Sequence, residues 1–587
     1  MESDTSMSRF VLIDNSLVEM GGHFFSHAVR VLHAAHDLGL DPVLATNRDF
    51  KLSREVPVEW PLYATFRYTA LGRYSEFSVA AEGASGGENK KDRYWQRIRR
   101  SVGLRKRVRS FTRSCKDLFQ RLPLESSDHV FLPFCTEISL LGLLRYMAYH
   151  PRAAIATWHL YYHSFCLPGR PPEWSAKGQQ AVVMKQALRQ AERLTGSIRI
   201  NFYATTQHLC EGLNRLSRVR FSYLPYPVET TTDGSSRPSP SGLPLRLVLA
   251  GQPRSEKGAA FCGELITSLW DRGLAAGELQ LRLQQRPGAA SLDLAPELHR
   301  AMLNRDPAAV EVASYPLSAR DYREFLRSAD IGLLMYDSAA YYARISSVML
   351  EFLCSGVPVI VPAGCWMGEV VAEANAQYLE RVSRDWKPIA FEALPVGAAQ
   401  RTDLRCRVTG DGDDLQRMVK RGGARVPAGA SVWLPTFRWE QPKSRGTYVC
   451  LELQQTDRCG NTLDRWSVML HHRDSTPASP ALFRLHKEAW EIHWSMRDAY
   501  AEIALPPGQL DAKFFGTDGV IPWGAIGLTA IDRSQIADLV SEISNHHRHY
   551  RESARTYGNA LRLRHTVAEH LSQLVDPVYE ADARHCA

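Results

Sequence analysis

The chain has 587 residues, of which 44% are hydrophobic and 23% are charged, a composition that excludes disordered and fibrous classes and fits a soluble globular protein. The length exceeds what one hydrophobic core organises, so we expect three or four domains. No apolar run approaches the roughly 20 residues of a membrane-spanning helix. The eleven cysteines include no Cys-x-x-Cys pair, and the start lacks a signal-peptide layout, so we expect a cytoplasmic protein.

The positive charge is concentrated in one segment. Residues 90–116 contain twelve Lys or Arg and a single Asp, whereas the whole chain has a net charge of +8. Trp95, Ile98 and Val102 share one helical face of this segment. Such a helix can lie on an anionic membrane surface, but a solvated surface helix is more common and is the interpretation we favour. Nucleic acid is not expected as a partner, because no recognition motif accompanies the charge.

The first part of the chain has the pattern of a parallel α/β domain. Residues 9–14 read as a buried strand, residues 24–39 as an amphipathic helix and residues 41–47 as the next strand. This order is a βαβ unit. Similar units follow as far as residue 228. We therefore predict a Rossmann-like domain over 1–228.

A second α/β series begins after a linker. Residues 229–243 are rich in Ser, Thr, Pro and Gly, which is linker composition. The chain then reads as strand 245–251, helix 258–273 and strand 279–284, and the α/β pattern continues to residue 378. We predict a second Rossmann-like domain that begins at residue 244. Two such domains in tandem place a cleft between them, and ligands bind at the carboxyl ends of parallel strands.

The pattern changes over residues 379–523. Short alternating runs separated by turn signals indicate an all-β module, either a sandwich or a small barrel. We interpret its tryptophans as core residues in preference to a sugar-binding platform. Residues 524–587 return to the pattern of the second domain and end in helices. The β module is therefore predicted to be inserted into the second domain.

Two cations follow the first strand of the second domain. The stretch "LVLAGQPRSEKG" is a strand, a glycine turn, Arg254, Lys257 and the start of a helix. Backbone N–H groups at a helix N-terminus favour an anion. Arg254 adds a planar fork of donors and Lys257 a point charge. Together they suit a diphosphate, and the alternative is that both are ordinary surface charges.

Glu351 lies in a helix that leads into the apolar strand "VPVIVPA", which reads as buried on both faces of a parallel sheet. A carboxylate beside such a strand can accept hydrogen bonds from ribose hydroxyls, as the acidic residue of dinucleotide sites does. The alternative is a half-exposed helix residue that pairs with Arg344 or another cation.

These motifs resemble a known family. In this order, "GQPRSEKG", "YREFLRSADIGLLMY" and "SSVMLEFLCSGVPVIVPAG" resemble the donor half of GT-B glycosyltransferases, in particular the large retaining class of glycosyltransferase family 4. "MGGHFFSHAVRVLHAAHDLG" is similar to the glycine-rich loop and first helix of their acceptor half. "IATWHLYYHS" is similar to their strand that ends in a histidine near the donor sugar, and "IGLTAIDRSQIADLVSEI" to the segment after the donor site. The resemblance covers about 1–375 and 524–575.

The resemblance implies a fold and roles for the two cations and Glu351. Two Rossmann-like domains would face each other across a cleft, and the last helix would cross back to the first domain. Arg254 and Lys257 would bind the nucleotide diphosphate and stabilise it as it leaves, where fixed positive charge acts strongly on a barrier. Glu351 would hold the ribose. No metal ion is expected, because the cations replace it, and no cofactor beyond the nucleotide-sugar substrate.

It also implies roles in the first domain. His159 would contact the transferred sugar, although a hydrogen-bonded structural histidine explains it as well. Gly21 and Gly22 would let the backbone approach the phosphates or the acceptor, and the alternative is that they serve only a tight turn. Retention of the anomeric configuration follows from the resemblance alone.

One position departs from the family pattern. The second glutamate, eight positions before the ribose-binding one, is replaced by Ala343. Tyr341, Tyr342, Arg344 and Ser346 are candidates for a different sugar pocket around it. This departure bears on the identity of the donor and on activity itself.

The sequence therefore predicts an α/β protein of GT-B architecture with an inserted all-β domain. Its predicted activity is glycosyl transfer, of a hexosyl kind, from a nucleotide-diphosphate donor to a hydroxyl of a glycan, a lipid-linked sugar or a small molecule. Polysaccharide biosynthesis is the expected setting. The alternative is an inactive GT-B scaffold that binds glycan or protein partners through the β module.

Overall fold

A computed structural model describes most of the chain. The residues it describes are 8–18, 23–51, 60–69, 90–163, 179–228, 244–251, 254–285, 297–298, 309–315, 317–394, 404–407, 416–440, 448–472, 478–498 and 508–575.

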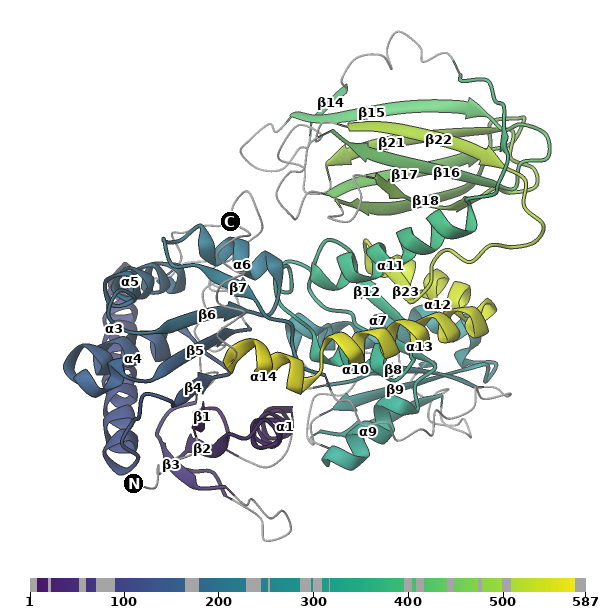
Figure 1. Ribbon diagram of the computed structural model, residues 1–587. Coiled ribbons are helices and arrows are strands. Elements are labelled where there is room, and N and C mark those ends of the chain that lie inside the picture. The colour runs from purple at the N-terminus through teal and green to yellow at the C-terminus, as the bar shows by residue number, and fades with distance from the viewer. Residues whose placement is uncertain are drawn as a thin grey trace.

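The first lobe is built on a seven-stranded parallel sheet in the order β3-β2-β1-β4-β5-β6-β7 (Figure 1). Its strands are β1 (Arg9–Asp14), β2 (Asp41–Asn47), β3 (Leu62–Phe66), β4 (His129–Leu132), β5 (Thr157–Tyr162), β6 (Ile200–Ala204) and β7 (Phe221–Tyr223). Its helices are α1 (His23–Asp37), α3 (Lys90–Arg121), α4 (Glu137–Tyr149), α5 (Gln179–Leu194) and α6 (Gln207–Asn214).

The apolar run of β1 is explained by helices on both faces of this sheet. Phe10 and Leu12 belong to a core cluster with α1, whereas Val11 and Ile13 point the other way, into a cluster with α4 and α5. Successive side chains of a strand alternate between the two faces, so a strand covered on both favours apolar residues between its polar ends.

The second lobe contains a six-stranded parallel sheet in the order β10-β9-β8-β11-β12-β23. Its strands are β8 (Leu245–Leu249), β9 (Leu279–Gln285), β10 (Val310–Ser314), β11 (Ile331–Leu333), β12 (Val359–Pro362) and β23 (Gly527–Ala530). Its helices are α7 (Cys262–Leu269), α9 (Ala319–Arg327), α10 (Ser347–Cys354), α11 (Trp366–Val382), α12 (Ile536–Asn545), α13 (His547–Arg564) and α14 (Val567–Val575).

The helix predicted over 258–273 begins later than expected. Two short 3-10 turns, Ser255–Lys257 and Ala259–Phe261, precede α7. Gly258 separates the turns with a left-handed φ of 82°, and a Cβ there would meet the Met335 carbonyl oxygen at 2.4 Å. A glycine is therefore required where this turn passes against the end of the neighbouring strand.

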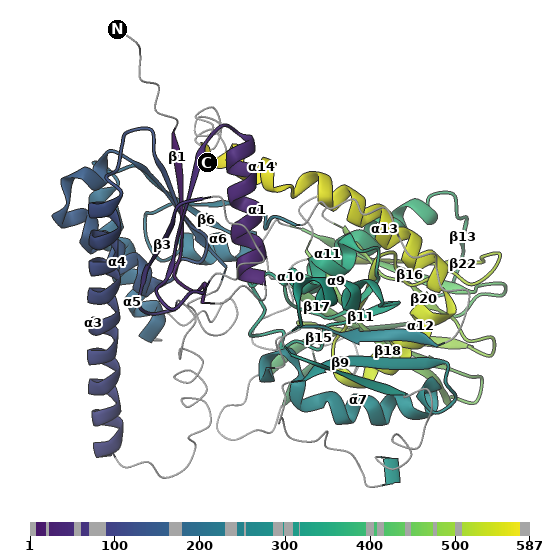
Figure 2. The ribbon, with the colours of Figure 1, turned by 90° about the horizontal axis from the view of Figure 1, so that it is seen from below.

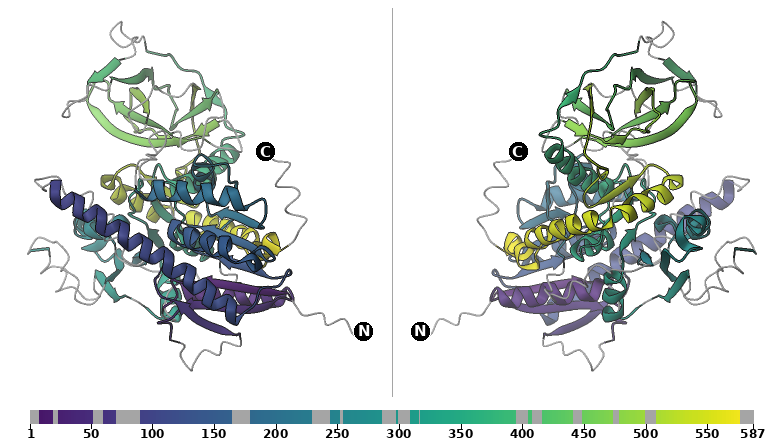
Figure 3. Two further views of the ribbon diagram at one scale, coloured as in Figure 1. Left: turned by 90° about the vertical axis from the view of Figure 1, so that its left-hand side faces the viewer. Right: turned by 90° about the vertical axis from the view of Figure 1, so that its right-hand side faces the viewer.

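Between β12 and its neighbour β23, the chain forms a separate antiparallel unit (Figure 3). One five-stranded sheet contains β13 (Pro388–Ile389), β22 (Gly508–Phe515), β16 (Val432–Trp439), β19 (Ala478–Pro480) and β20 (Phe483–Arg484). The other contains β14 (Leu404–Arg407), β15 (Gln416–Arg425), β21 (Glu491–Asp498), β17 (Tyr448–Thr456) and β18 (Thr462–His471). Trp433 and Trp439 are buried in its core, as the sequence interpretation favoured.

An ion pair fastens this antiparallel unit to the second lobe. The Arg484 guanidinium donates to both carboxylate oxygens of Glu542 in α12, at 2.6 and 2.8 Å. Glu542 is buried, and a two-pronged pair of this kind fixes orientation as well as distance. The unit is therefore held against the lobe at a defined angle.

The last helices return to the first lobe, as the resemblance implied. α13 packs on α10 of the second lobe, and α14 packs on α1 of the first; Figure 2 shows this crossing. Leu571 and Leu574 join the core cluster of α1, and His570 Nδ1 lies 3.1 Å from the Pro225 carbonyl oxygen. The helices α13 and α14 thus tie the two lobes together.

The basic segment is helical, as predicted, but apolar side chains in its second half are buried in the core of the first lobe. α3 lies on the outer side of the first lobe (Figures 1 and 2). Phe111, Cys115 and Leu118 are buried against α4, where a Cβ on Gly142 would meet the Phe111 Cβ at 2.8 Å. Within the described residues, no helix has both the length and the apolar character needed to cross a membrane.

The predicted fold class is confirmed. Two Rossmann-like parallel sheets and a separate antiparallel β unit make up the described chain.

Candidate active site

A hollow opens at the carboxyl ends of β8, β9 and β11. It has about 520 Å³ of empty volume and is open to solvent. This is the edge at which open parallel sheets bind ligands. The residues that line it are Leu249, Ala250, Gly251, Lys257, Ala259, Cys262, Leu283, Gln284, Gln285, Leu333 and Tyr336.

The turn after β8 brings Lys257 into this hollow. Gly251 has a left-handed φ of 96°, and its N–H donates to Gln284 Oε1 at 2.6 Å. A Cβ at this glycine would lie 3.2 Å from Lys257 Nζ. The ammonium group therefore lies directly over the turn, close to the backbone that a bound phosphate would approach.

The Lys257 ammonium is in a partly desolvated position. Its Nζ lies 5.1 Å from the centre of the Tyr336 ring, a distance at which the ring attracts a cation. Burial lowers the pKa of Lys257, and the positive charge of Arg254 adds to this effect, whereas the Glu351 carboxylate opposes it. Lys257 thus carries a charge that a bound anion would stabilise.

Arg254 occupies a different position from Lys257. It is the residue before the first 3-10 turn, its side chain is 43% exposed, and its guanidinium lies 3.5 Å from Glu256 Oε1. It is not among the residues that line the hollow. Of the two predicted phosphate-binding cations, Lys257 therefore lines the hollow, whereas Arg254 is exposed outside it.

Glu351 is half-buried on α10 and is oriented by a second residue. The Tyr322 hydroxyl of α9 donates to Glu351 Oε2 at 3.1 Å. Glu351 is not among the residues that line the hollow, and its negative charge opposes the lowering of the Lys257 pKa by burial.

The tyrosines before α10 continue this site. The Tyr341 ring lies 4.5 Å from the Tyr336 ring, and the Arg344 guanidinium lies 5.9 Å from the Tyr341 ring. Two neighbouring tyrosine rings therefore connect Lys257 to Arg344. Ser346 is used differently, because it is the N-cap of α10 and accepts from the Met349 N–H at 3.3 Å.

The position of the missing glutamate is enclosed. Ala343 is 2% exposed, and its carbonyl oxygen accepts from the Thr206 hydroxyl of the first lobe at 2.7 Å. Tyr342, beside it, is also buried and packs edge-on against the His208 ring. This loop is thereby fixed to the first lobe.

His159 does not lie at the end of its strand. It is in the middle of β5 and 0% exposed, with Nε2 3.1 Å from His129 Nδ1 and Nδ1 3.4 Å from the Tyr203 hydroxyl. Burial lowers its pKa. The histidine that follows the strand is His163, in an aromatic group with Phe134 and Tyr161. In this structure, His159 is too enclosed to contact a ligand.

Two of the predicted site residues lie in a part of the chain that the structure does not describe. Gly21 and Gly22 lie outside the described residues, so their predicted role stays a prediction. No group of three His, Cys, Asp or Glu side chains in the described part of the chain is placed to hold a metal ion.

Sequence reasoning missed two residues of the site, Tyr336 and Tyr322. Tyr336 ends the stretch 330–336, which is apolar after Asp330, and a polar tip just beyond a parallel strand is a signal for a ligand-facing residue. Tyr322 gave no such signal, because only the packing of α9 on α10 places its hydroxyl against Glu351.

No protein-family model matches the sequence, and no curated protein matches it. Among solved structures, the chain is similar to the N-terminal domain of trehalose-6-phosphate phosphatase from Candida albicans, with 13% identity, coverage of 61% of this chain and 83% of that chain, and a TM-score of 0.39. It is similar to α,α-trehalose-6-phosphate synthase from Burkholderia multivorans, with 11% identity, coverage of 63% of this chain and 85% of that chain, and a TM-score of 0.39. It is also similar to the catalytic domain of starch synthase IV from Arabidopsis thaliana bound to ADP and acarbose. The identity is 12%, the coverage is 62% of this chain and 85% of that chain, and the TM-score is 0.39. The architecture described above rests on the strand order of this chain itself.

Proposed function

We propose that this protein is a glycosyltransferase that moves a sugar, of the hexose class, from a nucleoside-diphosphate donor to an acceptor hydroxyl. The observation that carries the proposal is the Lys257 ammonium inside the hollow at the carboxyl ends of β8, β9 and β11. A fixed, partly desolvated cation at this edge favours a ligand with negative charge.

The chemistry follows from that charge. When the bond between the sugar carbon and the β-phosphate oxygen breaks, its electron pair stays on the diphosphate. Lys257 stabilises the developing negative charge, and Arg254, exposed near the hollow, adds a second positive charge. The acceptor oxygen forms the new bond to the sugar carbon, and its proton passes to an oxygen of the departing diphosphate. Because two side-chain cations carry this role, the proposal requires no metal ion, and retention is proposed from the family resemblance.

Glu351 and Tyr322 recognise the ribose of the donor in this proposal. A carboxylate accepts hydrogen bonds from ribose hydroxyls, and charge-assisted hydrogen bonds of this kind are the stronger ones. The Tyr322 hydroxyl holds the carboxylate in place. Tyr341 and Arg344 extend the site toward the sugar.

The enclosed Ala343 supports a second candidate function. A GT-B scaffold without the usual glutamate, with its donor loop bonded to Thr206, would bind glycan or protein partners through the antiparallel unit without transferring sugar. Nucleotide binding with no turnover would be its signature.

Peripheral contact with an anionic membrane through residues 90–116 is part of the proposal. Support comes from the side of α3 that turns away from the core. Its exposed cations are Arg105, Lys106, Arg109, Arg113 and Lys116. A lipid-linked acceptor would place the enzyme at such a surface.

A donor panel tests the proposed activity. Thermal unfolding is measured with nucleoside diphosphates, and the bases that raise the melting temperature are then offered as nucleotide sugars in hydrolysis and transfer assays. A ligand at a thousand times its dissociation constant adds about 4 kcal/mol to stability. Transfer with any donor supports the enzyme, binding without turnover supports the scaffold, and absence of both contradicts the nucleotide site.

A further inference from the structure

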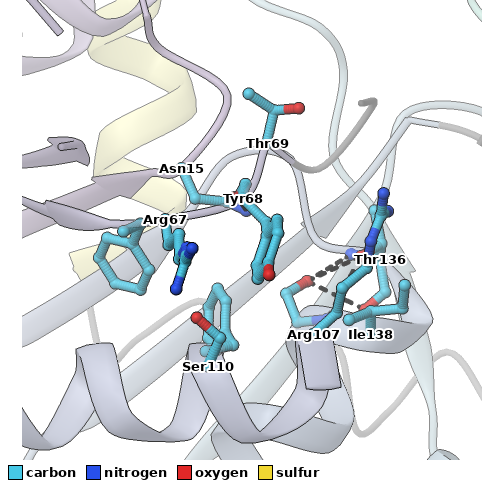
Figure 4. A pocket seen from close by; sticks show the side chains of 11 residues that line it. Asn15, Arg67, Tyr68, Thr69, Arg107, Ser110, Thr136 and Ile138 are labelled. Atoms are coloured by element: carbon cyan, nitrogen blue, oxygen red, sulfur yellow. Dashed lines mark hydrogen bonds between the residues drawn. The ribbon is translucent and has the colours of Figure 1, made fainter. Parts of the chain in front are cut away.

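Two hollows of this protein differ in how their polar side chains are used. The hollow of the first lobe has about 350 Å³ of empty volume, and Figure 4 shows the side chains that line it. There the Asn15 amide donates to the Tyr68 carbonyl oxygen at 2.9 Å, and the Thr136 and Ser139 hydroxyls lie 3.1 Å apart in the cap of α4. These polar groups hold segments of the protein together. The hollow of the second lobe contains a polar group that is not used in this way, on Gln284.

Gln284 lies in β9, one residue before its carboxyl end, and lines the same hollow as Lys257. It is only 5% exposed, and its Oε1 atom accepts from the Gly251 N–H at 2.6 Å. Because a backbone N–H can only donate, this bond requires the amide oxygen of Gln284 to face Gly251. The NH₂ group of the same amide therefore points away from the turn.

This NH₂ group is available to a ligand. Within the described part of the chain, Gln284 Nε2 makes no hydrogen bond, and it is not one of the fully enclosed polar atoms. The group is therefore open to the hollow that Gln284 lines. Polar groups of buried residues in folded proteins almost always have a partner, so this donor indicates an acceptor atom on a bound molecule.

The Lys257 ammonium lies on the same turn as this donor. Gln284 bonds to the Gly251 N–H, and a Cβ at Gly251 would lie 3.2 Å from Lys257 Nζ. Among the described residues, no carboxylate forms an ion pair with Lys257, and none of those that line the hollow is acidic. A cation and a neutral donor at one backbone turn suit an oxygen atom that carries negative charge.

We propose that Gln284 is a phosphate ligand of the donor site, and that its NH₂ group and the Lys257 ammonium together bind the diphosphate of the donor. The inference rests on the proposed function and adds to it a second ligand inside the hollow, which Arg254 does not line. A phosphate oxygen is favoured over an oxygen of the base or the ribose, because the neighbouring ammonium attracts negative charge. Gln284 is neutral, so it adds a hydrogen bond and leaves the positive charge to Lys257.

Calorimetric titration of the full chain tests the proposal. The probes are inorganic pyrophosphate, the diphosphates of uridine and adenosine, and the two nucleosides without phosphate. Gln284→Met removes the donor and adds no charge. Gln284→Glu keeps an acceptor for the Gly251 N–H, and so keeps the turn, but replaces the donor by an anion. Gln280→Glu is the matched control, because it makes the same change in the same strand at a residue that does not line the hollow. Thermal unfolding shows that each variant is folded.

We expect Gln284→Met to weaken binding of pyrophosphate and of the nucleoside diphosphates by about ten- to a hundredfold, because a hydrogen bond to a charged group is lost. Gln284→Glu should weaken it further through repulsion, and Gln280→Glu should leave it unchanged. In the Lys257→Met background, the additional loss caused by Gln284→Met should be smaller than in the parent protein, since the two side chains hold the same diphosphate.

Unchanged pyrophosphate binding in Gln284→Met overturns the proposal, and so does an equal loss in Gln280→Glu and Gln284→Glu. A loss that appears with the nucleosides and not with pyrophosphate also overturns it, because Gln284 would then contact the base or the ribose. These three outcomes leave the proposed function standing. A parent protein that binds neither pyrophosphate nor the nucleoside diphosphates overturns both, so the two failures are distinguishable.

Discussion

The Glu369 carboxylate lies 2.9 Å from His208 Nε2 and joins three parts of the chain. Its Oε1 atom also accepts from the Tyr448 hydroxyl at 2.7 Å. His208 belongs to α6 of the first lobe, Glu369 to α11 of the second, and Tyr448 to β17 of the antiparallel unit. His208 and Tyr448 are both about 1% exposed. One half-buried carboxylate thus contacts both lobes and the antiparallel unit.

Glu369→Ala should destabilise the protein by about 3–5 kcal/mol, because it leaves a buried imidazole and a buried hydroxyl without their common partner. Glu369→Gln keeps an acceptor for Tyr448 and should cost less. Glu373→Gln is the matched control, one turn along α11, where the carboxylate accepts a hydrogen bond from the exposed Gln377. Denaturant unfolding measures all three. A loss in Glu373→Gln equal to that in Glu369→Ala would count against the junction.

Asp14 predicts a pH dependence of stability. Burial raises its pKa from 3.8 to about 7, so protonation favours the folded state. Its contribution is complete below pH 3.8 and is lost as pH rises through 7, by about 4 kcal/mol for a shift of this size. Asp14→Asn removes the ionisation, so its advantage over the parent protein should grow between pH 4 and pH 8. Parallel unfolding free energies for the two proteins across this range would refute the assignment.

Glu351 predicts discrimination between nucleotide sugars. Glu351→Gln should weaken binding of a ribonucleoside diphosphate by about ten- to a hundredfold, because a charge-assisted hydrogen bond to the ribose is lost. The same change should leave a 2′,3′-dideoxy nucleotide unaffected. Tyr322→Phe should give a smaller loss, since the carboxylate remains but is no longer oriented. Equal losses for both nucleotides would show that Glu351 does not contact the ribose.

The exposed face of α3 predicts salt-sensitive membrane binding. Vesicles with anionic lipid should carry the protein upward in a flotation gradient at low salt and release it at high salt, since screening weakens attraction between exposed charges. Replacement of Arg105, Lys106 and Arg109 by Gln should reduce flotation in proportion to the charge removed. Failure of the parent protein to float at low salt would remove the membrane contact.

Much of the fold could be predicted because parallel strands have a strong sequence pattern. The boundaries predicted for β1 and β2 agree with the structure, since each is an apolar run between polar turns. Strand ends inside longer apolar stretches could not be placed. The resemblance implied a strand that ends at His159, but β5 runs on to Tyr162, which leaves His159 inside the sheet and His163 after the strand.

Residues of the candidate site could be proposed from the sequence only where the residue type and its place in the chain together indicate a binding role. Lys257 comes shortly after β8 and Glu351 lies on the helix that leads into β12, so a role could be proposed for each from its place in the chain. The contact of Tyr322 with Glu351 could not be predicted, because it depends on how α9 packs on α10. Glu369 and His208 are 161 positions apart in the sequence, so their contact could be seen only in the tertiary structure.

The central claim is that the Lys257 charge stabilises a departing diphosphate, and kcat/KM for the best donor tests it most directly. Lys257→Ala should lower this value by about a hundredfold or more, Lys257→Arg should retain part of it, and the surface control Arg320→Ala, whose side chain is 82% exposed, should retain all of it. Because burial lowers the pKa of Lys257, activity of the parent protein should fall in the alkaline range before that of Lys257→Arg does. An unchanged kcat/KM in Lys257→Ala would contradict the account.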